Sequence, residues 1–251
     1  MSGLTDSQID RYARHIVLKE VGGAGQQKLL RARVLVVGAG GLGSPLIMYL
    51  AAAGVGTIGV VDDDTVSRSN LQRQVLHGGD MLDQPKTESA IASVARLNDD
   101  VTVEAHQTRI SADNADDLVS GYDLVCDGSD NFATRFAVHD ACFRNRRPLV
   151  SAAILRFDGQ LATWRGYEDG LPCYRCLYPE IPPEEQTCAQ DGVLGAIAGV
   201  MGSMQAVEVI KELLGLGESM AGQLLIHDAL GATFRKVRVK PDPECPLCGG
   251  V

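Results

Sequence analysis

A glycine-rich turn between two apolar segments constrains the fold of this chain more than any other feature of its sequence. The apolar, β-branched run RVLVV, residues 33–37, is followed by GAGGLGS, residues 38–44. Gly38, Gly40 and Gly43 match the spacing GxGxxG, in which glycines let the backbone turn tightly from a strand into a helix and approach a phosphate. The sequence therefore predicts a βαβ unit with an anion site at the N-terminus of its helix.

Short apolar strands then alternate with helices up to about residue 153, which favours right-handed crossovers and a mostly parallel sheet. After Ala153 the texture changes, because LRFDGQLATWRG, GQLLIHD and ATFRKVRV alternate apolar and polar residues as antiparallel strands do. We predict an α/β fold with a Rossmann-like, mostly parallel sheet continued by antiparallel strands. A capping box at Thr5 and Gln8 predicts an N-terminal helix that runs to about Leu18.

The cysteines point to a metal site. Of seven cysteines, four form two CxxC pairs, Cys173 with Cys176 and Cys245 with Cys248. Each pair can present two thiolates to one ion, and four thiolates make a closed, structural zinc site. A redox dithiol is the rival interpretation, although it leaves the second pair without a purpose. The two cysteines within apolar patterns, Cys126 and Cys142, are expected in the core.

Length and charge limit the possible functions. A chain of 251 residues with 45% hydrophobic and 22% charged residues has room for one large α/β domain. Its net charge of −9 argues against broad binding to nucleic acid or to an anionic membrane. No export signal is recognised, and the longest apolar stretch, Val193–Met204, is too short to cross a bilayer. We expect a cytoplasmic protein, with one domain over 1–251: N-terminal helices in 5–30, a nucleotide-binding half in 31–153, and an antiparallel, zinc-bearing half in 154–251.

A cluster of polar residues downstream of the glycine turn favours a triphosphate over a dinucleotide. Asp62 ends the strand after the turn, where a ribose-binding acid is expected. Asn70, Arg73 and Lys86 follow within the same βαβ span, and these cations suit a ligand with more charge than a pyrophosphate diester. Asp130 directly follows another strand and can ligate Mg²⁺. The set indicates ATP with Mg²⁺. A nicotinamide-dependent oxidoreductase would leave Arg73 and Lys86 unexplained. Taken alone, each of these residues could instead be an ordinary solvent-exposed polar side chain.

Together these stretches resemble a known family. The segments VGAGGLGSP, DDDTVSRSNLQRQ, QPK, SDN followed by TR, PCYRCLYP and ECPLCGG occur in this order, and they are similar to the bacterial MoeB/ThiF family, in particular its MoeB members. These are E1-like enzymes that adenylate the C-terminal glycine of a small ubiquitin-like sulfur carrier. The resemblance covers nearly the whole chain and implies a single E1-like ATP-binding domain with an adenylyltransferase activity.

The resemblance also implies roles for single residues. Gly41 would lie against the nucleotide, Asn131 would accompany Asp130, and Arg14 would reach into the site of a neighbouring subunit in a homodimer. The carrier would be MoaD-like, ending in Gly-Gly and serving molybdopterin biosynthesis; a ThiS-like carrier in thiamine biosynthesis is the alternative, and an inactive nucleotide-binding scaffold a remote one. Sulfur would come from a separate sulfurtransferase or cysteine desulfurase.

Three details stay open. Cys188, in the polar loop PEIPPEEQTCAQDG, corresponds to a family cysteine considered for thioester or persulfide chemistry, or it is an accessible thiol without a required role. The chain reads DGSDN where the family usually reads DCTDN, so that Gly128 and Ser129 are departures. His15 and His77 either line the nucleotide site or are ordinary surface or half-buried residues.

Overall fold

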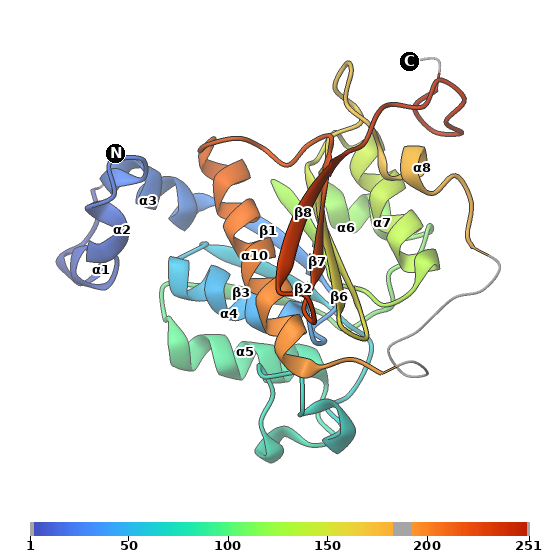
Figure 1. Cartoon of the computed structure of the whole chain (residues 1–251). Coiled ribbons are helices and arrows are strands. Elements are labelled where there is room, and N and C mark those ends of the chain that lie inside the picture. The colour runs from blue at the N-terminus through green and yellow to red at the C-terminus, as the bar shows by residue number, and fades with distance from the viewer. Residues whose placement is uncertain (1–2, 183–191, 250–251) are drawn as a thin grey trace.

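An eight-stranded sheet in the order β3-β2-β1-β4-β5-β6-β7-β8 runs through the residues that the computed structural model describes, 3–182 and 192–249 (Figure 1). The strands are β1 (Arg33–Val37), β2 (Thr57–Val61), β3 (Thr102–His106), β4 (Leu124–Asp127), β5 (Leu149–Leu155), β6 (Asp158–Trp164), β7 (Gln223–Asp228) and β8 (Thr233–Arg238). The helices are α1 (Asp6–Arg11), α2 (Ala13–Ile16), α3 (Gly22–Arg31), α4 (Gly43–Ala53), α5 (Lys86–Leu97), α6 (Ala115–Ser120), α7 (Phe132–Arg144), α8 (Tyr174–Leu177) and α10 (Gly195–Leu214), with short 3₁₀ turns at Arg68–Asn70 and Gly79–Met81.

The parallel half of the sheet, β3-β2-β1-β4-β5, has the order of a Rossmann fold. Its central strand β1 is apolar at nearly every position because both faces are covered. Val34 and Val36 pack with α4 and α10, whereas Leu35 and Val37 pack with α6 and α7. In Figure 1, α10 and α4 lie on one side of the sheet and α6 and α7 on the other. The predicted parallel sheet is thereby confirmed.

The antiparallel half, β5 to β8, continues the same sheet without a break. Helix α10 packs across β5 and β6. It also packs closely against the start of α4, because a Cβ at Gly202 would collide with the carbonyl oxygen of Leu42. The glycine-rich turn is therefore held by this second half of the molecule as well as by its own strands.

The N-terminal helix is shorter than predicted. The capping box of Thr5 and Gln8 is present, but α1 ends at Arg11 and α2 resumes at Ala13. The break falls at Tyr12, which is buried and whose hydroxyl is held in the 98–100 segment, 2.9 Å from Asn98 Nδ2 and 3.0 Å from Asp100 Oδ2. These contacts with a distant segment hold Tyr12 in place, so the helix predicted to run to about Leu18 is interrupted there.

Within residues 3–182 and 192–249, no helix is both long enough and apolar enough to span a bilayer.

Candidate functional site

An open cleft of about 750 Å³ lies at the carboxyl ends of the parallel strands. This is where nearly all the nucleotide-site residues expected from the sequence meet, because the carboxyl ends of parallel strands share one edge of a sheet. The expected residues that line the cleft are Gly38, Gly40, Gly41, Asp62, Asn70, Arg73, Lys86, Asp130 and Asn131. Ala153, Gln160 and Tyr178 extend the cleft toward the antiparallel half.

The glycine-rich turn has the backbone geometry that its spacing predicts. Gly38 has φ +90°, a conformation that side chains disfavour. Gly43 is the first residue of α4 and is buried behind the turn, since a Cβ there would collide with the carbonyl oxygen of Gly38. Gly40 and Gly41 face the cleft, whereas Gly43 serves the close packing of helix on turn. The N-terminus of α4 therefore points its free amides toward the cleft.

Asp62 ties the end of β2 to the glycine turn. Its Oδ2 accepts the backbone N–H of Ala39 at 2.8 Å, and its Oδ1 accepts that of Asp64 at 2.9 Å. Burial raises the pKa of this carboxyl, while nearby Lys86 acts in the opposite direction. Each carboxylate oxygen keeps a further lone pair for a ligand hydroxyl.

The cations of the cleft are already engaged by neighbouring side chains. Lys86 is the first residue of α5 and only 5% of its side chain is exposed, with Nζ 2.8 Å from Asp64 Oδ2 and 3.8 Å from Asp62 Oδ1. Arg73 Nη2 donates to Asn70 Oδ1 at 3.2 Å. Sequence reasoning did not single out Asp64, and its place in the run DDD was the only available signal. A phosphate entering the cleft would share or replace Asp64 as the partner of Lys86.

Asp130 lies in the loop after β4. In that loop the buried Asp127 accepts the N–H of Ser129 at 2.9 Å, and burial raises the Asp127 pKa. Asn131 caps α7 by accepting the N–H of Thr134 at 2.9 Å. Asp130 itself is exposed to the cleft. The carboxylates that converge within 4.8 Å of one another in the described residues are a different set, Asp62, Asp63 and Asp64.

Arg135 is a second residue that sequence reasoning did not assign. It lines the cleft, and its Nη2 donates to the carbonyl of Ser129 at 3.1 Å. The motif that carried the resemblance contains this arginine, in the dipeptide TR, and that was the available signal.

Besides Gly43, two further expected site residues are not found in the cleft within the described part of the chain. Arg14 is exposed on α2, and within residues 3–182 and 192–249 it makes no hydrogen bond or ion pair. Cys188 lies in 183–191, outside the described residues.

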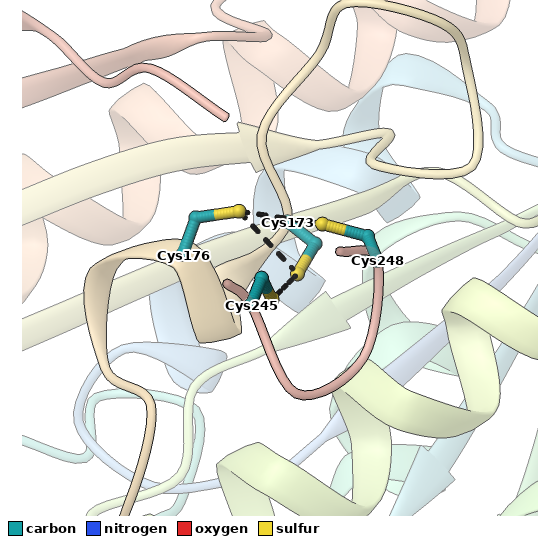
Figure 2. A group of neighbouring side chains, drawn as sticks. All are labelled: Cys173, Cys176, Cys245 and Cys248. Carbon is teal, nitrogen blue, oxygen red and sulfur yellow. Dashed lines mark hydrogen bonds between the residues drawn. The ribbon is translucent and has the colours of Figure 1, made fainter. Parts of the chain in front are cut away.

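Four cysteine sulfurs converge in a second cluster (Figure 2). Cys173 and Cys176 come from the start of α8, and Cys245 and Cys248 from the C-terminal turn. The Sγ–Sγ distances are 3.5 Å for Cys173 to Cys245, 3.4 Å for Cys176 to Cys248 and 3.9 Å for Cys173 to Cys176. The two CxxC motifs thus form one cluster, and the remaining described cysteines, Cys126 and Cys142, are buried elsewhere, as expected.

The cluster fits a zinc ion. Zn–S bonds of about 2.3 Å in a tetrahedron place sulfurs about 3.8 Å apart, close to the distances found. The backbone N–H of Asp242 donates to Cys176 Sγ at 3.4 Å, as it would to a thiolate. Although burial opposes it, the amides of Cys248 and Leu247 lower the pKa of Cys245 to about 7. The donor set, geometry and amide support therefore suit a closed Cys₄ zinc site.

Comparisons with known proteins match this arrangement. The ThiF family model covers residues 12–247. The chain is 51% identical over 248 residues to the SAMP-activating enzyme E1 of Haloferax volcanii, covering 98% of this chain and 91% of that protein. It is 48% identical over 250 residues to the sulfur carrier protein adenylyltransferase of Thermus thermophilus, covering 98% and 92%. It is 50% identical over 251 residues to adenylyltransferase and sulfurtransferase MOCS3 of Mus musculus, of which it spans about half, 54%, with 99% of this chain covered.

The fold is also found among solved structures. MccB of E. coli, solved with ATP, superposes with a TM-score of 0.83 at 21% sequence identity, covering 96% of this chain and 75% of that one. The family resemblance drawn from the glycine turn and the paired CxxC motifs is therefore confirmed, and this chain belongs to the ThiF family.

Proposed function

We propose that this protein is an adenylyltransferase that uses ATP to activate the C-terminal glycine of a small ubiquitin-like sulfur carrier protein. The carrier carboxylate attacks the α-phosphate of ATP, and the products are an acyl-adenylate and pyrophosphate. The observation that carries the proposal is the single cleft in which glycine-turn amides, Asp62, Arg73, Lys86 and Asp130 meet in the described chain. The names of the Thermus and Mus relatives, which describe adenylyltransferases, support it.

The residues of the cleft suit this reaction by position and charge. Asp62 would accept the ribose hydroxyls, and the amides of Gly40 and Gly41 would face the phosphates. Arg73 with Asn70, and Lys86 beside them, would neutralise charge on the phosphate oxygens as the α-phosphate is attacked. No enzymic nucleophile is needed, because the carrier supplies the attacking carboxylate, and correct positioning alone can lower the barrier by about 7 to 11 kcal/mol.

A divalent cation fits the same cleft. Asp130 is exposed to it directly after β4, and the carboxylate cluster of Asp62 to Asp64 lies along the same cleft. Asp130 would hold Mg²⁺, which would supply positive charge to offset that of the phosphates. The protein itself holds the loop of Asp130 in place. In that loop the N–H of Ser129 donates to Asp127, and the carbonyl of Ser129 accepts from Arg135.

The carrier's tail has an evident path into the cleft. Ala153, Gln160, Ile226 and Arg235 pair in register across β5, β6, β7 and β8, so their side chains share one face of the sheet. The row begins in the cleft at Ala153 and Gln160 and ends at the exposed strand β8. The small side chain of Ala153 at the cleft end would leave room for an extended diglycine, while the open sheet face would take the carrier's folded part.

We assign the carrier to the MoaD-like type, serving molybdopterin biosynthesis, with a ThiS-like thiamine carrier as the alternative. The whole chain would act as one ATP-binding domain with a structural zinc site. The pathway depends on which carrier fits the β5–β8 face, so the choice is an experimental one. The name of the Haloferax relative adds a SAMP-type carrier to the panel worth testing.

We also propose a homodimer in which Arg14 completes the site of the neighbouring subunit. Its exposed position and lack of an intramolecular partner within the described residues support this role. Apolar side chains exposed on adjacent helices, Tyr49 of α4 and Val207 of α10, each 57% exposed, offer a face for a second copy.

The function is tested by ATP–pyrophosphate exchange with Mg²⁺ and, in turn, MoaD-like, ThiS-like and SAMP-type carriers, each with and without its terminal glycine. Exchange that depends on one intact carrier would establish acyl-adenylate formation and name the pathway. Exchange without any carrier, or equally with truncated carriers, would contradict the proposal.

The dimer is tested by mixing subunits. Arg14→Ala and Arg73→Ala enzymes should each be inactive, whereas random mixing should restore about a quarter of the activity, since half the dimers then hold one intact site. A mixture as inactive as its parents would place Arg14 in its own subunit's site.

A further inference from the structure

A buried histidine joins the glycine turn to the helix that carries Lys86. His77 is 6% exposed. Its Nε2 lies 2.8 Å from the carbonyl oxygen of Ala39, and its Nδ1 lies 2.8 Å from Ser89 Oγ on α5. His77 does not line the cleft, so its contacts reach a ligand only through the groups that it holds.

These two contacts fix the tautomer of a neutral ring. A carbonyl oxygen can only accept, so Nε2 must carry a hydrogen and donate it to Ala39. In a neutral ring Nδ1 is then an acceptor and takes the hydroxyl hydrogen of Ser89. Burial lowers the pKa of His77, its bond to Ala39 and the charge of Asp62 act against that lowering, and the charge of Lys86 adds to it. The ring is therefore neutral, in a single tautomer, at neutral pH.

The backbone around Ala39 is held from both sides. Its N–H is donated to Asp62 and its carbonyl accepts from His77. In a trans peptide the N–H of the next residue points opposite to the carbonyl, and the described chain has no cis peptide. By holding the Ala39 carbonyl, His77 therefore directs the Gly40 N–H away from itself, and Gly40 lines the cleft.

The contacts close into a circuit around the phosphate end of the cleft. Ala39 is bound by Asp62, whose Oδ1 lies 3.8 Å from Lys86 Nζ. Lys86 and Ser89 both belong to the first turn of α5, and Ser89 returns to Ala39 through His77. A change at His77 would open this circuit and leave the glycine turn linked to α5 only through Asp62 and Lys86.

We propose that His77, supported by Ser89, is a positioning residue for ATP, which holds the Gly40 amide and Lys86 in their phosphate-binding arrangement before the nucleotide arrives. The proposal rests on the nucleotide site proposed above and adds to it a residue outside the cleft. Its effect falls on the affinity for ATP more than on the turnover of bound ATP.

The test compares two substitutions in the full-length protein. His77→Phe keeps a flat aromatic ring, slightly larger than imidazole, but removes the donor, and His77→Gln keeps a donor that reaches as far as Nε2. Calorimetry with ATP and Mg²⁺, and the KM and kcat of ATP–pyrophosphate exchange, are measured for both. We expect His77→Phe to raise the Kd and KM for ATP about tenfold, the equivalent of one lost hydrogen bond, with a smaller fall in kcat. His77→Gln should recover most of that loss.

A matched control separates positioning from stability. His227 is also buried, at 7% exposed, and its ring lies against Phe234 in the antiparallel half. His227→Phe should lower the melting temperature without raising the KM for ATP. Imidazole ¹⁵N spectra of the wild type should show His77 protonated at Nε2.

The possible outcomes distinguish a failure of the role of His77 from a failure of the proposed nucleotide site. A folded His77→Phe protein that binds ATP as tightly as the wild type, or a His77 ring protonated at Nδ1, overturns the role of His77 while leaving the nucleotide site intact. A His77→Gln protein as weak as His77→Phe also overturns it, because the donor would then be irrelevant. Failure of the wild type itself to bind ATP would instead remove the proposed nucleotide site, and this inference with it.

Discussion

The cleft and the four-cysteine cluster use reactive side chains in opposite ways. In the cleft, charged groups stand at an open edge of the sheet, and Lys86 faces Asp64, whose own side chain is 68% exposed. In the cluster, four sulfurs lie within 4.8 Å of one another and would supply all four ligands of a tetrahedral ion. The cleft can exchange partners during a reaction, whereas the cluster has no position left for a substrate. Function is therefore expected to fail first at the cleft, and stability first at the cluster.

The largest effect is expected from breaking the cluster. Cys173→Ser should remove bound zinc and lower the free energy of unfolding by about 4 kcal/mol or more, since loss of a metal is among the few changes of that size. Metal analysis and urea unfolding measure both. Cys142→Ser, at a buried cysteine outside the cluster, should keep its zinc. A zinc-loaded Cys173→Ser protein would refute the Cys₄ assignment.

The opposite pattern is expected at Arg73. Arg73→Ala should slow ATP–pyrophosphate exchange about 100- to 1,000-fold, because a donor aimed at transition-state charge is lost, while the melting temperature stays the same. Arg68→Ala, at an exposed arginine of the same segment that does not line the cleft, is the control and should remain active. An Arg73→Ala enzyme with wild-type exchange would place the phosphates elsewhere.

Asp130 should show a smaller loss that depends on the metal. Asp130→Asn keeps the shape of the side chain but removes its charge, so we expect exchange to fall about tenfold to 100-fold at low Mg²⁺. Titration with Mg²⁺ should recover part of it. A variant whose Mg²⁺ dependence equals that of the wild type would contradict the metal role.

Acid should affect stability next to the cluster through His139. Its Nε2 accepts the N–H of Tyr174 at 3.0 Å, and burial lowers its pKa despite the neighbouring Asp140. The unfolded chain then binds the proton more readily, so this stability is present above pH about 6.5 and is lost as the pH falls below it. Between pH 7.5 and 5.5, His139→Gln should lose less stability than the wild type in urea unfolding. Equal losses would mean that His139 does not titrate differently on folding.

The smallest effect is expected at Gly128, where the chain departs from its family. A Cβ there would lie 3.3 Å from Leu42 Cβ and 3.4 Å from the backbone nitrogen of Gly43. These contacts are tight but can relax, so Gly128→Ala should cost less than about 1 kcal/mol of stability. Because only a small shift of the loop is needed, the KM for ATP should change less than about threefold. A larger change in KM would show that this loop tunes the glycine turn.

The sequence predicted what local patterns determine. Strand periodicity placed Asp62 and Asp130 at strand ends, and the geometry of parallel sheets then brought them to one edge. The CxxC spacing predicted each cysteine pair. Because a closed zinc site needs four ligands, the two pairs were expected to meet in the fold.

Contacts set by tertiary packing were not predictable in this way. Asp64 as the partner of Lys86 and Arg135 as the partner of Ser129 depend on how the loop after each strand folds against the helix that follows it. The early end of α1 likewise depends on a tyrosine held by residues more than eighty positions away. The residues were visible in the sequence, but their partners were set by packing.

The separation of the two CxxC motifs along the chain has a consequence for synthesis. Cys173 and Cys176 leave the ribosome long before Cys245 and Cys248, and at about 5 to 20 residues per second the delay is about 3 to 14 seconds. During that interval a cysteine pair is exposed without its partners, while the nucleotide-binding strands have already emerged. A four-sulfur site can form only once Cys245 and Cys248 have emerged, so we expect the cluster to close after the nucleotide-binding strands have been made.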